Sequence, residues 1–322
     1  MAMSEIVTLL LPFFGLILLG YGVGTFRLIG ADALAGLEFF VFYCALPVLF
    51  FHLIATTPAA SLQGWSFVAT TTFATYCAFA IAFSVGALLN GGHVPEATVQ
   101  GLVGSYANTA YLAPALVIAA FGSVAAAPTG LILSFDSAML FVITPLMMAL
   151  GGTVRTDPAK LAEGIAREVL LNPIIIAVIL GFIAMAIGLR LPAGIDALLT
   201  LLRGAAAPVA LFVVGVSLSF RPLGPVSADM PIVIAVKLVA HPLIVYLLLS
   251  WIGGFDPLWV HTAVLIAALP PAANVVALAE RYNVHGDRAS VAVLLGAVVS
   301  VATVTVILIL ILNELLPSDP FH

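Results

Sequence analysis

Two short stretches of the sequence place proline and asparagine inside otherwise apolar segments. One runs from Gly104 to Pro114 and the other from Ala267 to Asn274. Proline has no amide hydrogen, clashes with the preceding helical turn and pushes the residue before it out of the helical region. Each stretch therefore predicts a break in a helix, and we expect Pro114 and Pro271 each to begin a second half-helix after the break.

Such breaks have the chemistry to bind an anion. The N-terminus of each new half-helix carries roughly half a positive charge, and Asn108 and Asn274 add amide groups that bind a carboxylate without a fixed charge. The simpler interpretation is a pair of packing kinks, which is less favoured because the two breaks occupy equivalent positions of an internal repeat. The candidate substrate-binding residues are Asn108, Thr109, Tyr111, Pro114, Pro270, Pro271, Asn274 and, in another apolar segment, His52.

Three ionisable residues inside apolar segments are candidates for coupling or charge compensation. Asp136 lies about eight residues, or roughly 12 Å, from the nearer end of its segment, too deep for a short side chain to reach water. We expect it to bind a coupling ion or proton, with a structural hydrogen bond as the alternative. Lys237 is long enough to snorkel to the interface, or else balances the substrate charge, and His241 follows on the same helix face.

No motif supports an enzyme. The sequence has no HExxH pair, no Walker loop, no Gly-x-Ser-x-Gly elbow and no paired aspartates suited to proteolysis within a membrane. We therefore expect no catalytic residue, no metal and no cofactor. Without an ATP site, transport would use an ion gradient of protons or sodium, or be facilitated. No basic cluster suggests nucleic acid as a partner.

Composition predicts an all-α integral membrane protein. The chain has 322 residues, of which 63% are hydrophobic and 8% charged, and a mean hydropathy of +1.25. Apolar runs of about 20 residues recur, the length needed to cross about 30 Å of hydrocarbon as a helix. We expect ten spans, near residues 5–26, 34–56, 65–89, 97–121, 128–150, 170–189, 197–219, 231–252, 259–280 and 289–312.

An internal repeat organises these spans. The glycine pair Gly91–Gly92 recurs as Gly253–Gly254, and proline, arginine and further landmarks keep nearly the same offset. The sequence therefore predicts a first five-span repeat at 1–150, a cytoplasmic linker at 151–169 and a second repeat at 170–322. Five is an odd number, so the second repeat must be inverted relative to the first, and spans 4 and 9 are the broken pair.

Basic residues set the expected orientation. Most of them fall in the connections that lie on one side of the membrane if the N-terminus is outside: Arg27, Arg155, Lys160, Arg167, Arg221, Arg281 and Arg288. We therefore expect both termini on the outer, periplasmic side of an inner (plasma) membrane. The linker stretch Pro158–Glu168 predicts a short amphipathic helix at the interface.

The sequence resembles the auxin efflux carrier family, which includes plant auxin exporters and bacterial malate or malonate carriers and shares its overall design with bile-acid/sodium symporters. The similar residues are Asn108 to Pro114, Pro270 to Asn274, and Ala45 to Phe51. The resemblance implies two broken helices that cross at the midplane, with a carboxylate near Asn108 and Asn274. It also implies a scaffold of spans 1, 2, 6 and 7 that often dimerises, and an elevator-like transport domain of spans 3–5 and 8–10.

The short central connection, of about 20 residues, departs from the long-loop plant exporters, so a bacterial-type carrier of small organic acid anions such as malate or malonate fits better than an auxin exporter. Two alternatives stay open. One is a sodium-coupled symporter of larger amphipathic anions, and the other is a membrane sensor that binds its ligand without transporting it.

Overall fold

The computed structural model describes residues 3–56, 64–152, 157–221, 226–284 and 286–321, and within them the chain is helical apart from turns and one isolated β-bridge. Its first half contains α1 (Met3–Thr25), α2 (Ala31–Phe40), the π-helical turn η1 (Val41–Ala45), α3 (Leu46–Ala55), α4 (Trp65–Leu89), α5 (Val94–Ser105), α6 (Leu112–Phe121), the short 3-10 turn η3 (Ser123–Ala125) and α7 (Ala126–Leu150). Its second half contains α8 (Pro158–Leu170), α9 (Pro173–Ala186), α10 (Ala193–Ser219), α11 (Met230–Ala235), the π-helical turn η4 (Val236–Ala240), α12 (His241–Ile252), α13 (Pro257–Ala267), α14 (Asn274–Arg281) and α15 (Gly286–Leu312).

Several of these helices are long and apolar enough to cross a membrane. The described residues contain six such spans, or seven if α8 and α9, which meet at a bend of 57°, are counted as one. A helix of 25 residues is about 37 Å long, which exceeds the roughly 30 Å of hydrocarbon in a bilayer. Helices α5, α6, α13 and α14 are each shorter than this, because the chain is interrupted between α5 and α6 and between α13 and α14, as the proline-rich stretches predicted.

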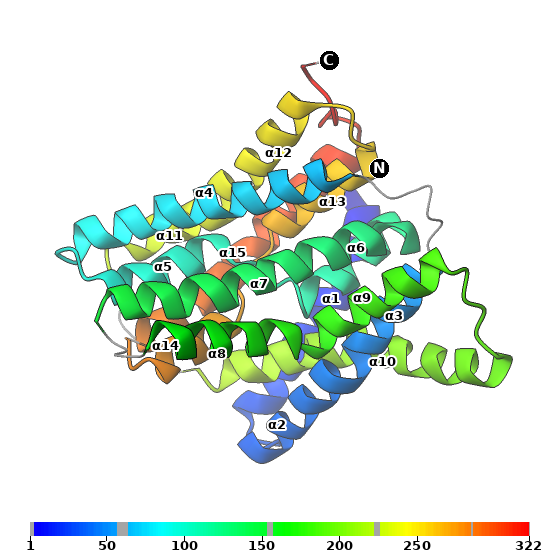
Figure 1. Ribbon diagram of the computed structural model, residues 1–322, viewed down its shortest axis with the longest axis horizontal. Helices are drawn as coiled ribbons and strands as arrows, with labels where there is room; N and C mark the ends of the chain where they lie inside the picture. The colour runs from blue at the N-terminus through cyan, green and yellow to red at the C-terminus, as the bar shows by residue number, and fades with distance from the viewer. Residues whose placement is uncertain (1–2, 57–63, 153–156, 222–225, 285, 322) are drawn as a thin grey trace.

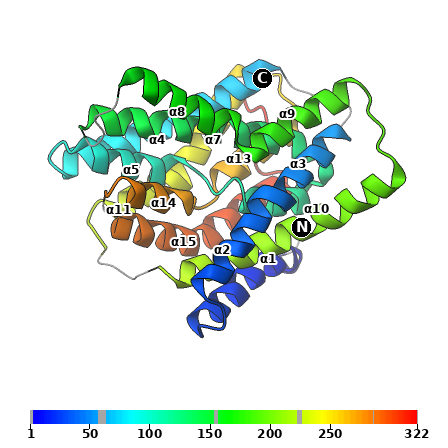
Figure 2. The same cartoon turned by 60° about the horizontal axis from the view of Figure 1, so that its bottom comes forward.

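One group of helices packs around α10. In Figures 1 and 2, α1, α2 and α3 lie against α10, and α3 also packs along α9. The contact between α1 and α10 is very close at glycine: a Cβ added at Gly20 would overlap the carbonyl oxygen of Phe212, and one at Gly215 would overlap that of Ile17. Glycine at these contact positions lets the backbones of two membrane helices approach each other closely.

A second group of helices contains both interrupted pairs. Helix α4 packs along α5 and α12, α12 packs on α13, and α14 packs on α15 (Figure 1). Buried apolar side chains from α4, α5, α7, η4, α14 and α15 form a shared core. The two breaks are therefore held inside protein rather than in contact with lipid, which unpaired backbone groups require.

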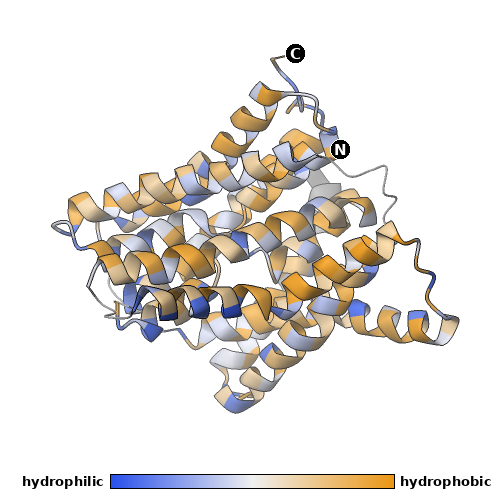
Figure 3. Ribbon diagram, viewed as in Figure 1, coloured by the Kyte–Doolittle hydropathy of each residue, from blue (hydrophilic) through white to orange (hydrophobic). Residues whose placement is uncertain are grey.

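The predicted amphipathic helix in the linker is confirmed as α8. In Figure 3, strongly hydrophilic (blue) parts of the ribbon recur along α8 between hydrophobic ones. Asp157 caps the first turn of α8 by accepting a hydrogen bond from the amide of Ala159 at 3.0 Å. Glu168 near its end pairs with Arg281 of α14 at 2.8 Å. Of the three linker residues counted for orientation, Lys160 and Arg167 lie in α8, and Arg155 lies outside the described residues.

Candidate functional site

The two interrupted helices cross at their breaks and pair with each other. The amide of Asn108 donates to the carbonyl of Pro270 at 2.9 Å, and the amide of Ala272 donates to the carbonyl of Tyr106 at 3.2 Å. These bonds form an antiparallel bridge between Ala107 and Pro271. Each non-helical segment supplies hydrogen-bond partners for backbone groups of the other. Two such segments can therefore lie in the interior of an apolar protein.

The prolines act in two different ways at the crossing. Pro114 is the third residue of α6 and so lies in the first turn of the new half-helix, as expected. The expectation that Pro271 begins a half-helix is wrong, since α14 begins three residues later, at Asn274. The reason is the bridge: the chain around Pro271 pairs with the segment from Tyr106 to Asn108 and therefore does not continue as a helix there.

A large cavity lies beside the crossing. It has a volume of about 490 Å³ and lies between the two non-helical segments and helices α1, α10 and α15. Asn108, Pro270 and Pro271 contribute to its wall, and most of the other lining residues are apolar: Phe14, Ile17, Leu18, Leu112, Val214, Leu218, Ala273, Val293, Leu294, Leu295, Ala297, Val298 and Val301, with Tyr21 and Ser300 as polar members. A concave, mainly apolar pocket with few polar groups is typical of a site for a small organic molecule. We call it the crossing pocket.

The other predicted substrate residues take different places. Thr109 and Pro114 are buried beside the crossing, whereas Tyr111 and Asn274 are partly exposed, at the starts of α6 and α14, and are absent from the wall of the crossing pocket. The structure does not bring His52 to this pocket. Its Nε2 lies 2.7 Å from Asp196 Oδ1 and its Nδ1 lies 3.3 Å from an Arg203 guanidinium nitrogen, where α3 meets α10.

The three buried ionisable candidates form one hydrogen-bonded chain. Lys237 Nζ lies 3.1 Å from His241 Nδ1, and the Nε2 of the same ring lies 3.3 Å from the hydroxyl of Thr75. That hydroxyl is in turn 3.3 Å from Asp136 Oδ1. We call these four residues the buried charge network.

The network corrects one expectation and adds a residue. Lys237 does not snorkel: its side chain is 0% exposed, because Nζ is held inside by His241 and by the carbonyl of Ala267 at 2.5 Å. Thr75 was missed from the sequence, since a threonine in an apolar helix usually bonds only to its own backbone. Its only sequence signal was the spacing of Thr71 and Thr75, which places two hydroxyls on one face of α4.

Comparisons with known proteins identify the family. A family model described as "Membrane transport protein" matches residues 5–308. Over 321 residues, 99% of this chain and 100% of the other, the sequence is 43% identical to a protein of Rhizobium meliloti (strain 1021) named "Putative malonate transporter". The chain belongs to the auxin efflux carrier-type membrane transport family. It is a multi-pass membrane transporter and not an enzyme.

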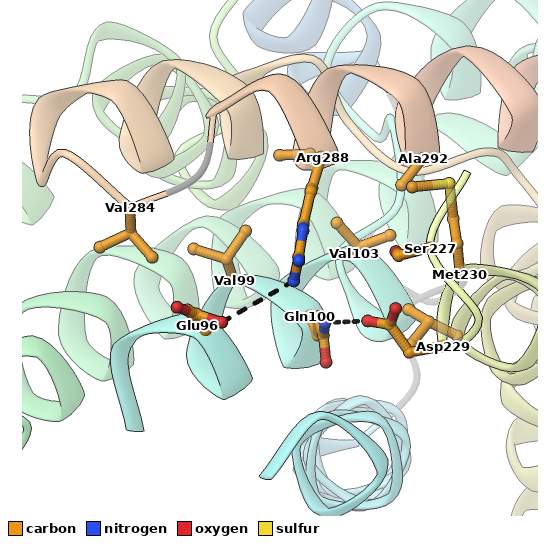
Figure 4. A pocket seen from close by; sticks show the side chains of 12 residues that line it. Glu96, Val99, Gln100, Val103, Ser227, Asp229, Met230, Val284, Arg288 and Ala292 are labelled. Carbon is orange, nitrogen blue, oxygen red and sulfur yellow. Dashed lines mark hydrogen bonds and ion pairs between the residues drawn. The ribbon is translucent and has the colours of Figure 1, made fainter. Parts of the chain in front are cut away.

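This transporter also has a polar cluster away from the crossing pocket, which Figure 4 shows. It joins the N-terminal parts of α5 and α15 to the residues that precede α11, around a small pocket of about 30 Å³. Arg288 lies 3.8 Å from Glu96, and the side-chain amide of Gln100 donates a hydrogen bond to the carboxylate of Asp229. The sequence did not single out Gln100 or Asp229, because the two residues are 129 positions apart in the chain.

The pairing of Gln100 with Asp229 predicts a stability effect. Asp229 is 6% exposed, so Asp229→Ala leaves the Gln100 amide without its charged acceptor and is expected to lower the free energy of unfolding by about 1.5–3 kcal/mol. The loss of stability is measured by thermal unfolding of the purified transporter and its Asp229→Ala variant. Glu163→Ala, which removes an exposed carboxylate from α8, is the control and should be nearly neutral. Equal midpoints for the two variants would contradict the role of this pair.

Proposed function

We propose that this transporter carries small organic acid anions, with malonate as the first candidate, and that it binds them in the crossing pocket. The observation that carries the proposal is the buried side chain of Asn108 in the wall of that pocket, 4% exposed and next to the bridge of the two breaks. An amide binds a carboxylate by a charge-assisted hydrogen bond without bringing a full charge into the membrane. The name of the Rhizobium meliloti relative supports malonate as the substrate to test first.

The start of α6 is a second source of attraction for the anion. Leu112, the first residue of α6, lines the crossing pocket. The amides of Leu112 and Ala113 donate to the Asn108 carbonyl at 3.2 and 3.3 Å, so α6 would attract the anion through the partial charge of its N-terminus. A helix N-terminus carries a partial positive charge that favours a carboxylate. Together with Asn108, it supports recognition of one carboxylate group, while the apolar wall contacts the carbon skeleton.

The proposed architecture is ten spans in two inverted five-span repeats, 1–150 and 170–322. Helices α1, α2–α3, α9 and α10 would form the scaffold, and α4 to α7 with α11 to α15 would form a transport domain that moves as an elevator. The close contacts of α1 and α3 with α10, and the core that α4 and α5 share with α7, α11, α14 and α15, support this division. A homodimer through the scaffold is part of the same proposal.

Both termini would lie on the periplasmic side of the inner membrane. The polar helix α8 and the Arg281 and Arg288 side chains would then lie on the cytoplasmic side, which the positive-inside rule favours. The ion pair of Arg281 with Glu168 holds α14 and α8 at the same end of the molecule, which supports this arrangement.

The experiment combines ligand binding with flux. We expect malonate at about a hundred times its dissociation constant to stabilise the purified protein by about 2.7 kcal/mol, whereas sugars and organic cations leave the unfolding midpoint unchanged. Proteoliposomes should take up labelled malonate and exchange it for unlabelled malonate inside. Stabilisation without any flux would identify a sensor instead, and stabilisation only by cations or sugars would refute anion binding.

A further inference from the structure

No described residue in the wall of the crossing pocket carries a charge. The wall residues from the two non-helical segments and from α1, α6, α10 and α15 are apolar, except for Asn108, Tyr21 and Ser300. The ammonium group of Lys237 is held elsewhere, by the carbonyl of Ala267 at 2.5 Å. Within the described part of the chain, an anion in this pocket therefore meets dipoles and no fixed positive charge.

The dipoles that line the pocket suit one carboxylate group. The side-chain amide of Asn108 can donate hydrogen bonds, and the N-terminus of α6 carries a partial positive charge at Leu112. Burial of a second full charge without a partner is costly, because apolar side chains replace the water that solvated it. The wall therefore favours an anion that carries a single charge.

Ser300 is the polar residue that α15 contributes to the same wall. Its side chain is buried, at 1% exposed, and its hydroxyl donates to the carbonyl of Ala297 at 2.7 Å. A serine hydroxyl has one hydrogen to donate and two lone pairs that accept. Because the hydrogen is bound within α15, Ser300 offers the pocket an acceptor. It suits a ligand group that donates a hydrogen bond, and it disfavours a carboxylate.

The position of Ser300 suits a short ligand that also reaches Asn108. A Cβ added at Gly296 would overlap the ring of Pro271, so α15 touches the crossing at this glycine. Ser300 follows four residues later, about one helical turn or 6 Å along the same face of α15. Asn108 is next to Pro271 through the bridge of the two breaks. A three-carbon acid can therefore place one end group at Asn108 and the other at Ser300.

We propose that the crossing pocket binds malonate as hydrogen malonate, with the ionised carboxylate at Asn108 and the protonated carboxyl group at Ser300. This inference rests on the proposed function. The dianion takes one proton from water before it binds, which forms an O–H bond on one carboxylate, and the proton returns to water after release. The O–H group donates to the Ser300 hydroxyl oxygen. The ligand class is thus a singly charged acid whose second polar group is neutral and donates a hydrogen bond.

Three small acids test the charge of the bound form on the wild-type protein by isothermal titration calorimetry. Malonamate has a neutral amide in place of one carboxyl group of malonate, and sulfoacetate carries two negative charges. Neither changes its charge between about pH 6 and pH 8. We expect the ratio of the malonate to the malonamate dissociation constant to rise about tenfold for each pH unit above the second pKa of malonic acid, because the fraction of hydrogen malonate falls tenfold. Sulfoacetate should not bind.

The malonamate measurement also controls for titration of the protein. Tyr21 is the titratable side chain of the described pocket wall, and the buried charge network is a further set of titratable groups. Their titration would alter the affinities for malonamate and malonate alike, so the ratio removes it. A ratio that stays constant, or sulfoacetate that binds as tightly as malonamate, would overturn the inference and leave the anion-carrier proposal standing. If neither malonate nor malonamate binds at any pH, the carrier proposal fails together with the inference.

Ser300→Ala tests the second contact. We expect the affinity for malonamate to fall about three- to tenfold, the loss of one hydrogen bond, while propionate, a monoanion without a second polar group, binds as before. Thr305→Ala is the matched control, since its hydroxyl donates to the carbonyl of Val301 in its own helix and lies outside the pocket wall. Equal losses for malonamate and propionate, or no loss for malonamate, would refute the role of Ser300. If Ser300→Ala does not fold, the wild-type measurements with the three acids still decide the charge of the bound form.

Discussion

Asn108→Ala is expected to lower the rate of malonate transport about ten- to a hundredfold. Asn108 contributes a buried amide to the wall of the crossing pocket, and a hydrogen bond to a charged group contributes about 1.5–3 kcal/mol, of which each 1.4 kcal/mol is a factor of ten. Alanine keeps the backbone bond from residue 108 to Pro270, so the bridge should survive. Initial uptake and ligand-induced stabilisation in the same preparation measure the two consequences.

The control for this variant is Asn313→Ala. Asn313 follows the end of α15, where its side-chain amide donates to the carbonyl of Ile309 at 2.9 Å, and it is not part of the wall of the crossing pocket. The Asn313→Ala variant loses the same side-chain amide, but at a position outside the proposed substrate site. Uptake should therefore stay close to that of the wild type. If Asn108→Ala transports malonate as well as Asn313→Ala does, the carboxylate is bound elsewhere.

Gly215→Ala is expected to destabilise the protein by about 3 kcal/mol, the upper part of the range for adding a methyl group to a close-packed contact. A Cβ at Gly215 overlaps the backbone carbonyl of Ile17, and backbone cannot move aside as a flexible side chain can. Helices α1 and α10 would have to separate. We expect a lower unfolding midpoint and less folded protein in the membrane.

Gly204→Ala in the same helix is the matched control. An added Cβ there meets no atom within 4 Å, so the substitution should be neutral or should stabilise α10 by up to about 1 kcal/mol through helix propensity. The pair separates a packing effect from a change in the helix itself. Equal stability of the Gly215 and Gly204 variants would mean that α1 and α10 do not pack as the structure shows.

The sequence predicted local features of the site well. Proline chemistry acts over a few residues, so the interruptions between α5 and α6 and between α13 and α14 followed from the positions of Pro114 and Pro270. The amphipathic linker helix, now α8, followed in the same way from its pattern of polar residues. Patterns of this kind do not depend on which helix lies next to them, so a single sequence contains them in full.

The errors have one physical origin. Pro271 was expected to begin a helix, and one of the two interpretations of Lys237 was that it reaches the membrane surface. Both expectations used only the residue's own segment. The structure instead pairs the chain at Pro271 with Ala107 and holds Lys237 against His241 and the carbonyl of Ala267. A partner across the fold offered each group a better interaction than its local alternative.

By itself, the sequence determined that this chain is an apolar helical protein with two interrupted helices that carry asparagine. It also marked Asp136, Lys237 and His241 as residues too costly to bury without a partner. Only the tertiary structure decided that these three meet through Thr75, that Asn108 faces a cavity, and that His52 pairs with Asp196 instead. Periodicity and proline act along the chain, whereas a buried charge is stabilised by whichever groups the packing of distant helices brings within hydrogen-bonding distance.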